Sequence, residues 1–136
     1  MCLDKITRRP KKWTEGYGFK AFQLGRNEKG KLTSWVQGDR EKVYPKRRWL
    51  HEKDYRGTGT WEATDFIDIG GSKRDYRKGF HVLESKIHAF LHASSNEVVH
   101  RVKYRKCHTV GVNVMMDGAG EVYVATEMII LEQITG

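Results

Sequence analysis

Hydrophobic and polar positions alternate most regularly in the last third of the chain. From Val98 to Lys106 alternate residues form two sets, one apolar and aromatic in character and one rich in cations. This period of two is typical of a β-strand. Valines alternate again from 110 to 114, a turn is expected at 117–120, and Glu121–Leu131 follows as a long apolar strand. We expect two or three antiparallel strands here, at the centre of a sheet.

The first half of the chain predicts shorter strands. Gly16–Leu24 and Leu32–Gln37 are expected to form a β-hairpin, because a polar, glycine-containing turn separates them. Lys42–Leu50 contains Pro45, which restricts it to an edge strand or a loop. The sequence therefore predicts one hairpin followed by a less regular edge.

Two short strands and one helix are expected between these regions. The strands are Trp61–Ile69 and Gly79–Leu83, and the helix is Glu84–Ser94. Three large apolar residues share one face of this helix and are expected to contact the sheet: Ile87, Phe90 and Leu91. The predicted fold is α+β, an antiparallel sheet of about six strands with one main helix packed on one face.

Composition and charge add limits on the domain organisation and on the partners. The chain has 136 residues and a net charge of +8, so we expect a basic N-terminal arm at 1–15 and a single α+β domain at 16–136. Residues 1–60 hold 16 Lys and Arg against 7 Asp and Glu, whereas residues 61–136 hold 9 against 10. This uneven basic charge favours anionic partners such as nucleotides, nucleic acid or a nucleoprotein complex.

The sequence also sets expectations about location. It has no run of 18 apolar residues and its first residues lack the apolar region of a secretory signal, so we expect no membrane partner. Its two cysteines are too few for a disulfide framework. We therefore predict a cytoplasmic protein.

The cation-rich side of the 98–106 strand is the main candidate binding site. Arg101, Lys103 and Arg105 alternate along it, and such side chains lie about 7 Å apart on a strand. A file of this kind matches several phosphates or one polyanionic ligand. The alternative is the solvated outer side of a half-buried sheet, and the sequence leaves both open.

Further candidates mix cations with aromatic residues or glycines. Lys46, Arg47 and Arg48 lie between Tyr44 and Trp49, a composition suited to phosphates and bases. The alternative is an edge strand kept soluble by its charges.

The glycine-rich segment 56–60 begins with Arg56 and suits a phosphate, although it lacks the spacing of a Walker motif. The segment 70–79 adds four more cations among glycines and is expected to be a binding loop.

Motifs for catalysis and for metal binding are weak or missing in the sequence. His88 and His92 are four residues apart, but the spacing suggests no third ligand, so we expect no metal and no cofactor. Cys107 and His108 are neighbours on a strand and so point to opposite faces, which argues against a dyad. His81 is able to donate to a ligand, although a core histidine is the simpler interpretation. We expect no catalytic residues.

Several runs in the second half resemble a known family of phage proteins. These runs are Tyr76–Leu83, Ala89, Glu97–Lys106 and Val122–Met128, within about the last 60 residues. They resemble the first-described Thoeris anti-defence family, which sequesters a cyclic ADP-ribose-type immune signal without cleaving it. The resemblance implies an α+β oligomer with pockets for adenine and diphosphate. By position, it implies that Phe80 stacks on a base and Arg105 holds phosphate, with Arg26 and Arg56 as further matches by spacing.

Three hypotheses follow for function. The first is a phage-type anti-defence protein that binds and sequesters an anionic nucleotide messenger, of the cyclic ADP-ribose or cyclic oligonucleotide type. The second is a basic nucleic-acid-binding module, or an inhibitor of a CRISPR complex or nuclease. The third is a nucleotide-acting enzyme, such as a relative of ADP-ribosyl transferases. We also expect a homo-oligomer, with the apolar segment Met128–Leu131 exposed for pairing with a copy of itself.

Overall fold

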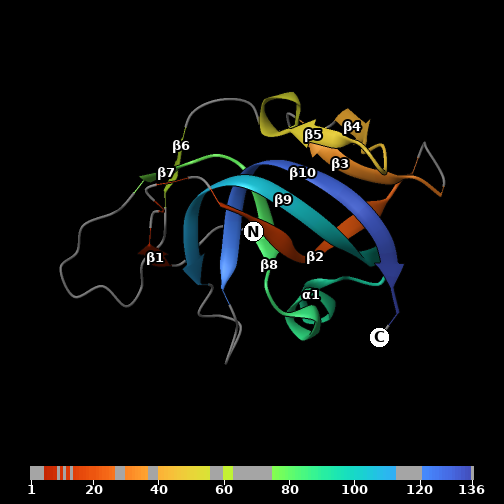
Figure 1. Cartoon of the computed structure of the whole chain (residues 1–136). Helices are drawn as coiled ribbons and strands as arrows, with labels where there is room; N and C mark the ends of the chain where they lie inside the picture. Colours follow the sequence, from red (N-terminus) through yellow and green to blue (C-terminus); the bar gives the residue numbers. More distant parts are fainter. Residues whose placement is uncertain are drawn as a thin grey trace.

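The two long strands near the end of the chain form the centre of the fold (Figure 1). In the computed structural model, β9 spans Glu97–Val112 and β10 spans Val122–Ile134, and they pair antiparallel over most of their length. The structure describes residues 5–8, 10, 12, 14–26, 30–36, 40–55, 60–62, 75–112 and 121–135. The turn expected at 117–120 lies outside these residues, whereas the expected 98–106 and 110–114 strands join in the single strand β9 as far as residue 112.

Shorter strands extend this pair on both sides into an antiparallel sheet of eight strands. They are β1 (Lys5–Arg8), β2 (Thr14–Leu24), β3 (Leu32–Val36), β4 (Arg40–Val43), β5 (Trp49–His51) and β8 (Phe80–Leu83). The short 3₁₀ helix η1 (Glu52–Asp54) follows β5, and β6 (Thr60–Glu62) pairs with β7 (Asp75–Arg77) in a separate small sheet.

The α+β class is confirmed in outline, but the expected number of about six strands is wrong. Two differences account for most of the excess. Residues 5–8 of the expected arm form β1, which pairs with β9. The segment 42–50, expected as an edge strand or a loop, is divided by a bend at 44–48 into the end of β4 and the start of β5.

The central strands return on themselves to form a ring. β2 pairs with β9, β9 with β10, β10 with β8, and β8 meets β2 where Leu83 pairs with Phe19. Gly18 allows this last approach. A Cβ at that position would lie 2.4 Å from Cγ1 of Val82 and 2.7 Å from the carbonyl oxygen of Leu83, and neither atom has room to move without shifting β8.

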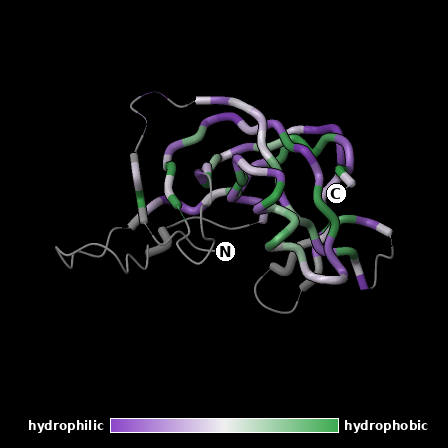
Figure 2. The backbone as a smooth tube through the Cα atoms, turned by 90° about the horizontal axis from the view of Figure 1, so that it is seen from below, coloured by the Kyte–Doolittle hydropathy of each residue, from purple (hydrophilic) through white to green (hydrophobic). Residues whose placement is uncertain are grey.

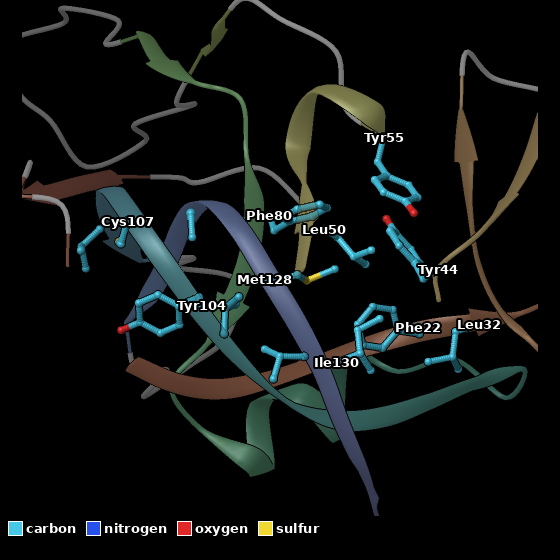
Figure 3. Packing of buried hydrophobic residues seen from close by; sticks show 14 residues of the cluster. Phe22, Leu32, Tyr44, Leu50, Tyr55, Phe80, Tyr104, Cys107, Met128 and Ile130 are labelled. Carbon is cyan, nitrogen blue, oxygen red and sulfur yellow. The ribbon is translucent and has the colours of Figure 1, made fainter. Parts of the chain in front are cut away.

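The main hydrophobic core fills the inside of this ring (Figure 3). Phe22, Phe80 and Met128 are among its largest fully buried side chains. Tyr44 stacks on Tyr55 with ring centroids 4.5 Å apart, and both rings approach Phe80 edge-on or tilted. These three aromatic rings therefore fill the side of the core that lies beneath β4, β5 and η1.

Met128 and Ile130 belong to this core, so one expectation about the last strand is wrong. Both side chains are fully buried. β10 has β9 on one side and β8 and β5 on the other, so it is no edge strand over this segment. The expected route to self-association through 128–131 is closed, and the oligomeric state itself remains a prediction.

The helix α1 (Lys86–His92) is shorter than expected and faces the sheet differently. Its N-cap is Ser85, whose hydroxyl accepts a hydrogen bond from the backbone of His88. Ala89, Phe90 and Ala93 pack into a second apolar cluster on the outside of the ring. The small alanines let the helix approach closely.

Ile87 and Leu91 therefore point away from the sheet, contrary to the expectation from their spacing, and are 69% and 72% exposed. Within the part of the chain that the structure describes, no helix has the length and apolar character needed to cross a membrane.

An irregularity in β9 changes which residues are buried. Lys106 has a left-handed backbone (φ 58°), and the pairing of β9 shifts register against β2 and β10 near this point. Cys107 consequently joins the core beside Tyr104, although simple alternation placed it with the cations. Along the strands, Figure 2 shows hydrophilic and hydrophobic positions interspersed, as expected where side chains point alternately inward and outward.

Candidate functional site

The outward side chains of four neighbouring strands form a row across the sheet. Tyr17 on β2 pairs with Lys103 on β9, Lys103 pairs with Ile129 on β10, and Ile129 pairs with Trp49 on β5. Directly opposite residues on antiparallel strands point to the same side of a sheet, so these four side chains share one face. A second outward row joins Arg105 to Glu127 and then to His51.

These rows and their immediate neighbours define a surface that we call the open face. It consists of Tyr17, Trp49, His51, Arg101, Lys103, Arg105, Lys106, Glu127, Ile129 and Glu132. The intervening row of Tyr104, Met128 and Leu50 points inward to the core. Arg101, Lys103 and Arg105 thus lie together on the outward side of β9, as their alternation predicts.

Two carboxylates on β10 partly neutralise these cations. The Arg105 guanidinium donates through Nε to Glu127, and Lys106 Nζ lies 3.2 Å from the other oxygen of the same carboxylate. Burial acts to raise the pKa of Glu127, but the hydrogen bonds from Arg105 and Lys106 outweigh it and hold that pKa below its usual value. Because the Glu127 side chain is only 12% exposed, this carboxylate is a permanent part of the face.

Glu132 is held much less firmly. Its Oε1 lies 2.7 Å from Arg101 Nε, and both side chains are more than two-fifths exposed. The Glu132 pKa is lowered by its own backbone N–H and then by Arg101. Arg101 Nε is itself buried, whereas the two side chains as a whole are exposed, so the contact is an ion pair at the surface of the sheet. Exposed pairs of this kind contribute only about 0–1 kcal/mol to stability.

Aromatic rings lie against the cations of β9. The Arg101 guanidinium lies 5.1 Å and Lys103 Nζ 5.5 Å from the centroid of the Tyr17 ring. The Arg105 guanidinium lies 3.8 Å from the centroid of the Trp49 ring. These distances are within the range of cation–π attraction. The face therefore presents planar groups and positive charges side by side.

A basic bend borders the open face. Lys46, Arg47 and Arg48 are exposed in the connection between β4 and β5. The Arg47 backbone N–H donates to the carbonyl of Ile130, which holds the bend against β10. In the described part of the chain, none of these three cations and no atom of Lys103 is within ion-pair distance of a carboxylate.

Arg47 shares its unusual backbone with Lys106, since both have positive φ values, 66° and 58°. A glycine would adopt either conformation without steric cost, whereas the left-handed region costs a side-chain-bearing residue roughly 1–2 kcal/mol. Both positions carry a cation and both border the open face. Backbone strain of this kind tends to gather at functional sites.

The structure does not bring the residues expected from the family resemblance into one pocket. Phe80 is fully buried in the core, so it has no ring face for a base, and its proposed stacking role is withdrawn. Arg105 lies on the opposite, outward side of the sheet. Arg26 follows the end of β2, which pairs near Glu97, far along β9 from Arg105. Arg56 and most of the 56–60 and 70–79 segments lie outside the described residues.

Two other expected ligand groups are structural. His81 is 5% exposed, and its ring Nε2 lies 3.1 Å from the hydroxyl of Tyr76. Tyr44, expected with Trp49 to flank the cations of 46–48, is 3% exposed and belongs to the core. Of that aromatic and cationic cluster, Trp49 alone contributes its ring to the open face.

The described residues contain no arrangement typical of a metal centre or a nucleophilic pair. No group of three His, Cys, Asp or Glu residues among them has metal-binding geometry. Cys107 is buried, and its thiol donates to the carbonyl of Thr109. The His108 ring contacts the Thr109 hydroxyl at 2.8 Å, and burial lowers the pKa of His108 to about 4.

Sequence reasoning missed the partners that shape the open face. Tyr17 was assigned only to a strand, because its position opposite Lys103 depends on the register between segments more than 80 residues apart. Glu127 falls within the apolar pattern of the expected strand Glu121–Leu131, and Glu132 lies just beyond its expected end. Their positions relative to the cations required the register of β10 on β9.

No family model, curated protein or solved structure matches this chain.

Proposed function

We propose that the protein binds nucleic acid on the open face. The observation that carries this proposal is the row of Tyr17, Lys103, Ile129 and Trp49, which alternates ring, charge, apolar group and ring across four registered strands. Nucleic acid offers matching chemistry, because phosphates pair with cations and bases stack on rings or guanidinium planes. The proposal takes the second of the hypotheses drawn from the sequence.

The distribution of charge supports this choice over a small enclosed ligand. The open face and the 46–48 bend together carry seven cations and two carboxylates, spread over four strands and one connection. An extended polyanion makes contact with such a surface at several points. The surface lies on the outside of the ring, where a chain of phosphates has room to follow it.

A direct binding assay tests the proposal. Fluorescence anisotropy with a labelled 20-nucleotide mixed-sequence oligonucleotide at 50 mM KCl should show saturable binding. Lys103→Ala should weaken it several-fold, since each charge-assisted contact is worth about 1.5–3 kcal/mol before solvent screening reduces it. Lys86→Ala is the matched control, because Lys86 is an exposed cation on α1 outside the open face. Absence of binding at low salt would refute the proposal.

A second candidate is the capture of a small nucleotide messenger without cleavage, as in the phage anti-defence hypothesis. One observation favours it: Arg105 and Trp49 form a tight guanidinium–indole pair, 3.8 Å from group to ring centroid. This pair matches one phosphate and one base of a mononucleotide or cyclic nucleotide. The burial of Phe80 removes the stacking group that the family resemblance had suggested.

Mass spectrometry separates this candidate from the first. The protein would be purified from cells that make immune nucleotides, and heated to release what it holds. An intact nucleotide that is lost in Trp49→Leu but kept in Trp49→Phe would support capture by the Arg105–Trp49 pair. A released fragment of the nucleotide would instead indicate an enzyme.

A further inference from the structure

We infer that the open face selects single-stranded over double-stranded nucleic acid, using Tyr17 and the Arg105–Trp49 pair as two platforms for unpaired bases. This inference rests on the proposed function, and it specifies the class of ligand. The planar groups of the open face can stack only on base faces that reach them. Those groups are useful only to a ligand whose bases are accessible.

Tyr17 is the first platform. It is 55% exposed, which is high for a large aromatic residue on a central part of a sheet. Tyr17 lies directly opposite Lys103 in the pairing of β2 with β9, so its ring is on the same outward side of the sheet as the Lys103 side chain. Arg101 and Lys103 both lie over the ring within 5.5 Å of its centroid. A base stacked at Tyr17 therefore has two cations beside it for the adjoining phosphate.

The Arg105–Trp49 pair is the second platform. The Arg105 side chain is 38% exposed, and its guanidinium rests on the Trp49 ring. Its Nε is engaged by Glu127, which limits its rotation. Guanidinium planes stack on bases much as aromatic rings do. The buried Glu127 carboxylate thus acts as a positioning group for Arg105.

The distance between the platforms suits successive parts of one strand. Tyr17 and Trp49 lie on strands three steps apart in the sheet, so they are separated by three strand spacings of about 4.8 Å each, measured along the sheet. Lys103 and Ile129 lie between them. A single strand that crosses the sheet can present one base to each platform and its phosphates to the cations between.

A duplex cannot use this arrangement. Its bases are stacked on one another and paired, so their faces are closed to side chains, and it offers only phosphates and groove edges. On the open face a duplex would gain only the attraction between its phosphates and the cations. The free energy of stacking a base on an aromatic ring, about 1–3 kcal/mol for each base, is then available to single strands only.

The test compares one sequence in two forms. A 20-nucleotide strand and its duplex would be titrated at the same salt with the wild-type protein, Tyr17→Leu and Tyr17→Phe. We expect wild type to bind the single strand more tightly. Tyr17→Leu should lose roughly 5- to 150-fold in single-strand affinity, with duplex affinity unchanged, while Tyr17→Phe retains the ring and the affinity. Because Tyr17 is exposed, Tyr17→Leu should keep the wild-type Tm, which excludes unfolding as the cause.

The possible failures are distinguishable. If neither form binds, the proposed function fails. If the two forms bind equally and Tyr17→Leu changes nothing, while Lys103→Ala still weakens binding, the protein is a nucleic-acid binder and the stacking inference is overturned. A loss of affinity for both forms in Tyr17→Leu would also overturn it, because a duplex has no base for the ring.

Discussion

The salt dependence of binding offers the most quantitative test of the open face. Arg101, Arg105 and Lys106 already contact carboxylates of the protein, so they release few additional counterions when a ligand binds. On the open face and the 46–48 bend, four cations have no such partner among the described residues: Lys46, Arg47, Arg48 and Lys103. If each neutralises one phosphate, the slope of log K against log salt for a single strand is about −2.8, and a rise from 50 to 200 mM KCl weakens binding about 50-fold.

Single substitutions should move this slope in opposite directions. Lys103→Ala removes one phosphate contact and makes the slope shallower by about 0.7. Glu132→Gln removes the exposed competitor of Arg101 and should make the slope steeper by about 0.7 while raising the affinity at low salt. Lys86→Ala, with the same change of charge on α1, should leave the slope unchanged.

Anisotropy titrations at five salt concentrations between 50 and 300 mM would measure these slopes. A wild-type slope shallower than about −1 would show that the unpaired cations do not contact phosphate. An unchanged slope in Glu132→Gln would show that Arg101 is not exchangeable, contrary to the exposed ion pair seen here.

Three further predictions concern the fold. Gly18→Ala should lower the free energy of unfolding by about 1–3 kcal/mol in urea titrations, because its Cβ would overlap Val82 and Leu83; a wild-type stability would show that β2 and β8 do not close the ring. The Tm should fall as pH is lowered from 6.5 towards 4, because the pKa of His108 is about 4 in the fold and 6.5 in the unfolded chain, which therefore binds more protons in this window. His108→Gln should flatten that part of the profile, and an unaltered profile would contradict the burial of this imidazole. Leu91→Ser should leave Tm within the small range typical of surface changes, whereas Ala89→Ser should lower it, since Leu91 is exposed and Ala89 is buried; equal effects would mean that the helix faces the sheet through Leu91 after all.

Local patterns predicted much of this fold. The hairpin of β2 and β3, the strand β8, the helix α1 and the long strand β10 all fall close to their expected residues. Each of them is marked by period, by turn residues or by a cap within about ten residues of sequence. The apolar composition of the strand Gly79–Leu83 (GFHVL) by itself predicts a short buried strand, and Phe80 is buried accordingly. Its assignment to a ligand came from the family resemblance and conflicted with that local pattern.

What the sequence could not supply was register over long distances. The closure of β8 on β2 depends on one registered pair, Leu83 with Phe19, and on the missing side chain of Gly18. The orientation of α1 depends on which of its apolar residues are small enough for close packing. The candidate site has the same origin, because the row from Tyr17 to Trp49 exists only when four separate strands are aligned.

The ring of strands also has a consequence for how the chain folds. β2 lies near the N-terminus, and its main partner β9 begins more than 70 residues later. During synthesis, β2 must therefore wait with most of its backbone hydrogen-bonding groups unpaired until β9 has left the ribosome. Long-range pairing of this kind slows folding, to milliseconds or seconds in typical small β-rich domains. Over that interval the nascent chain exposes a strand edge to other chains, so yield on expression should depend on synthesis rate and on chaperones more than the stability of the finished fold would suggest.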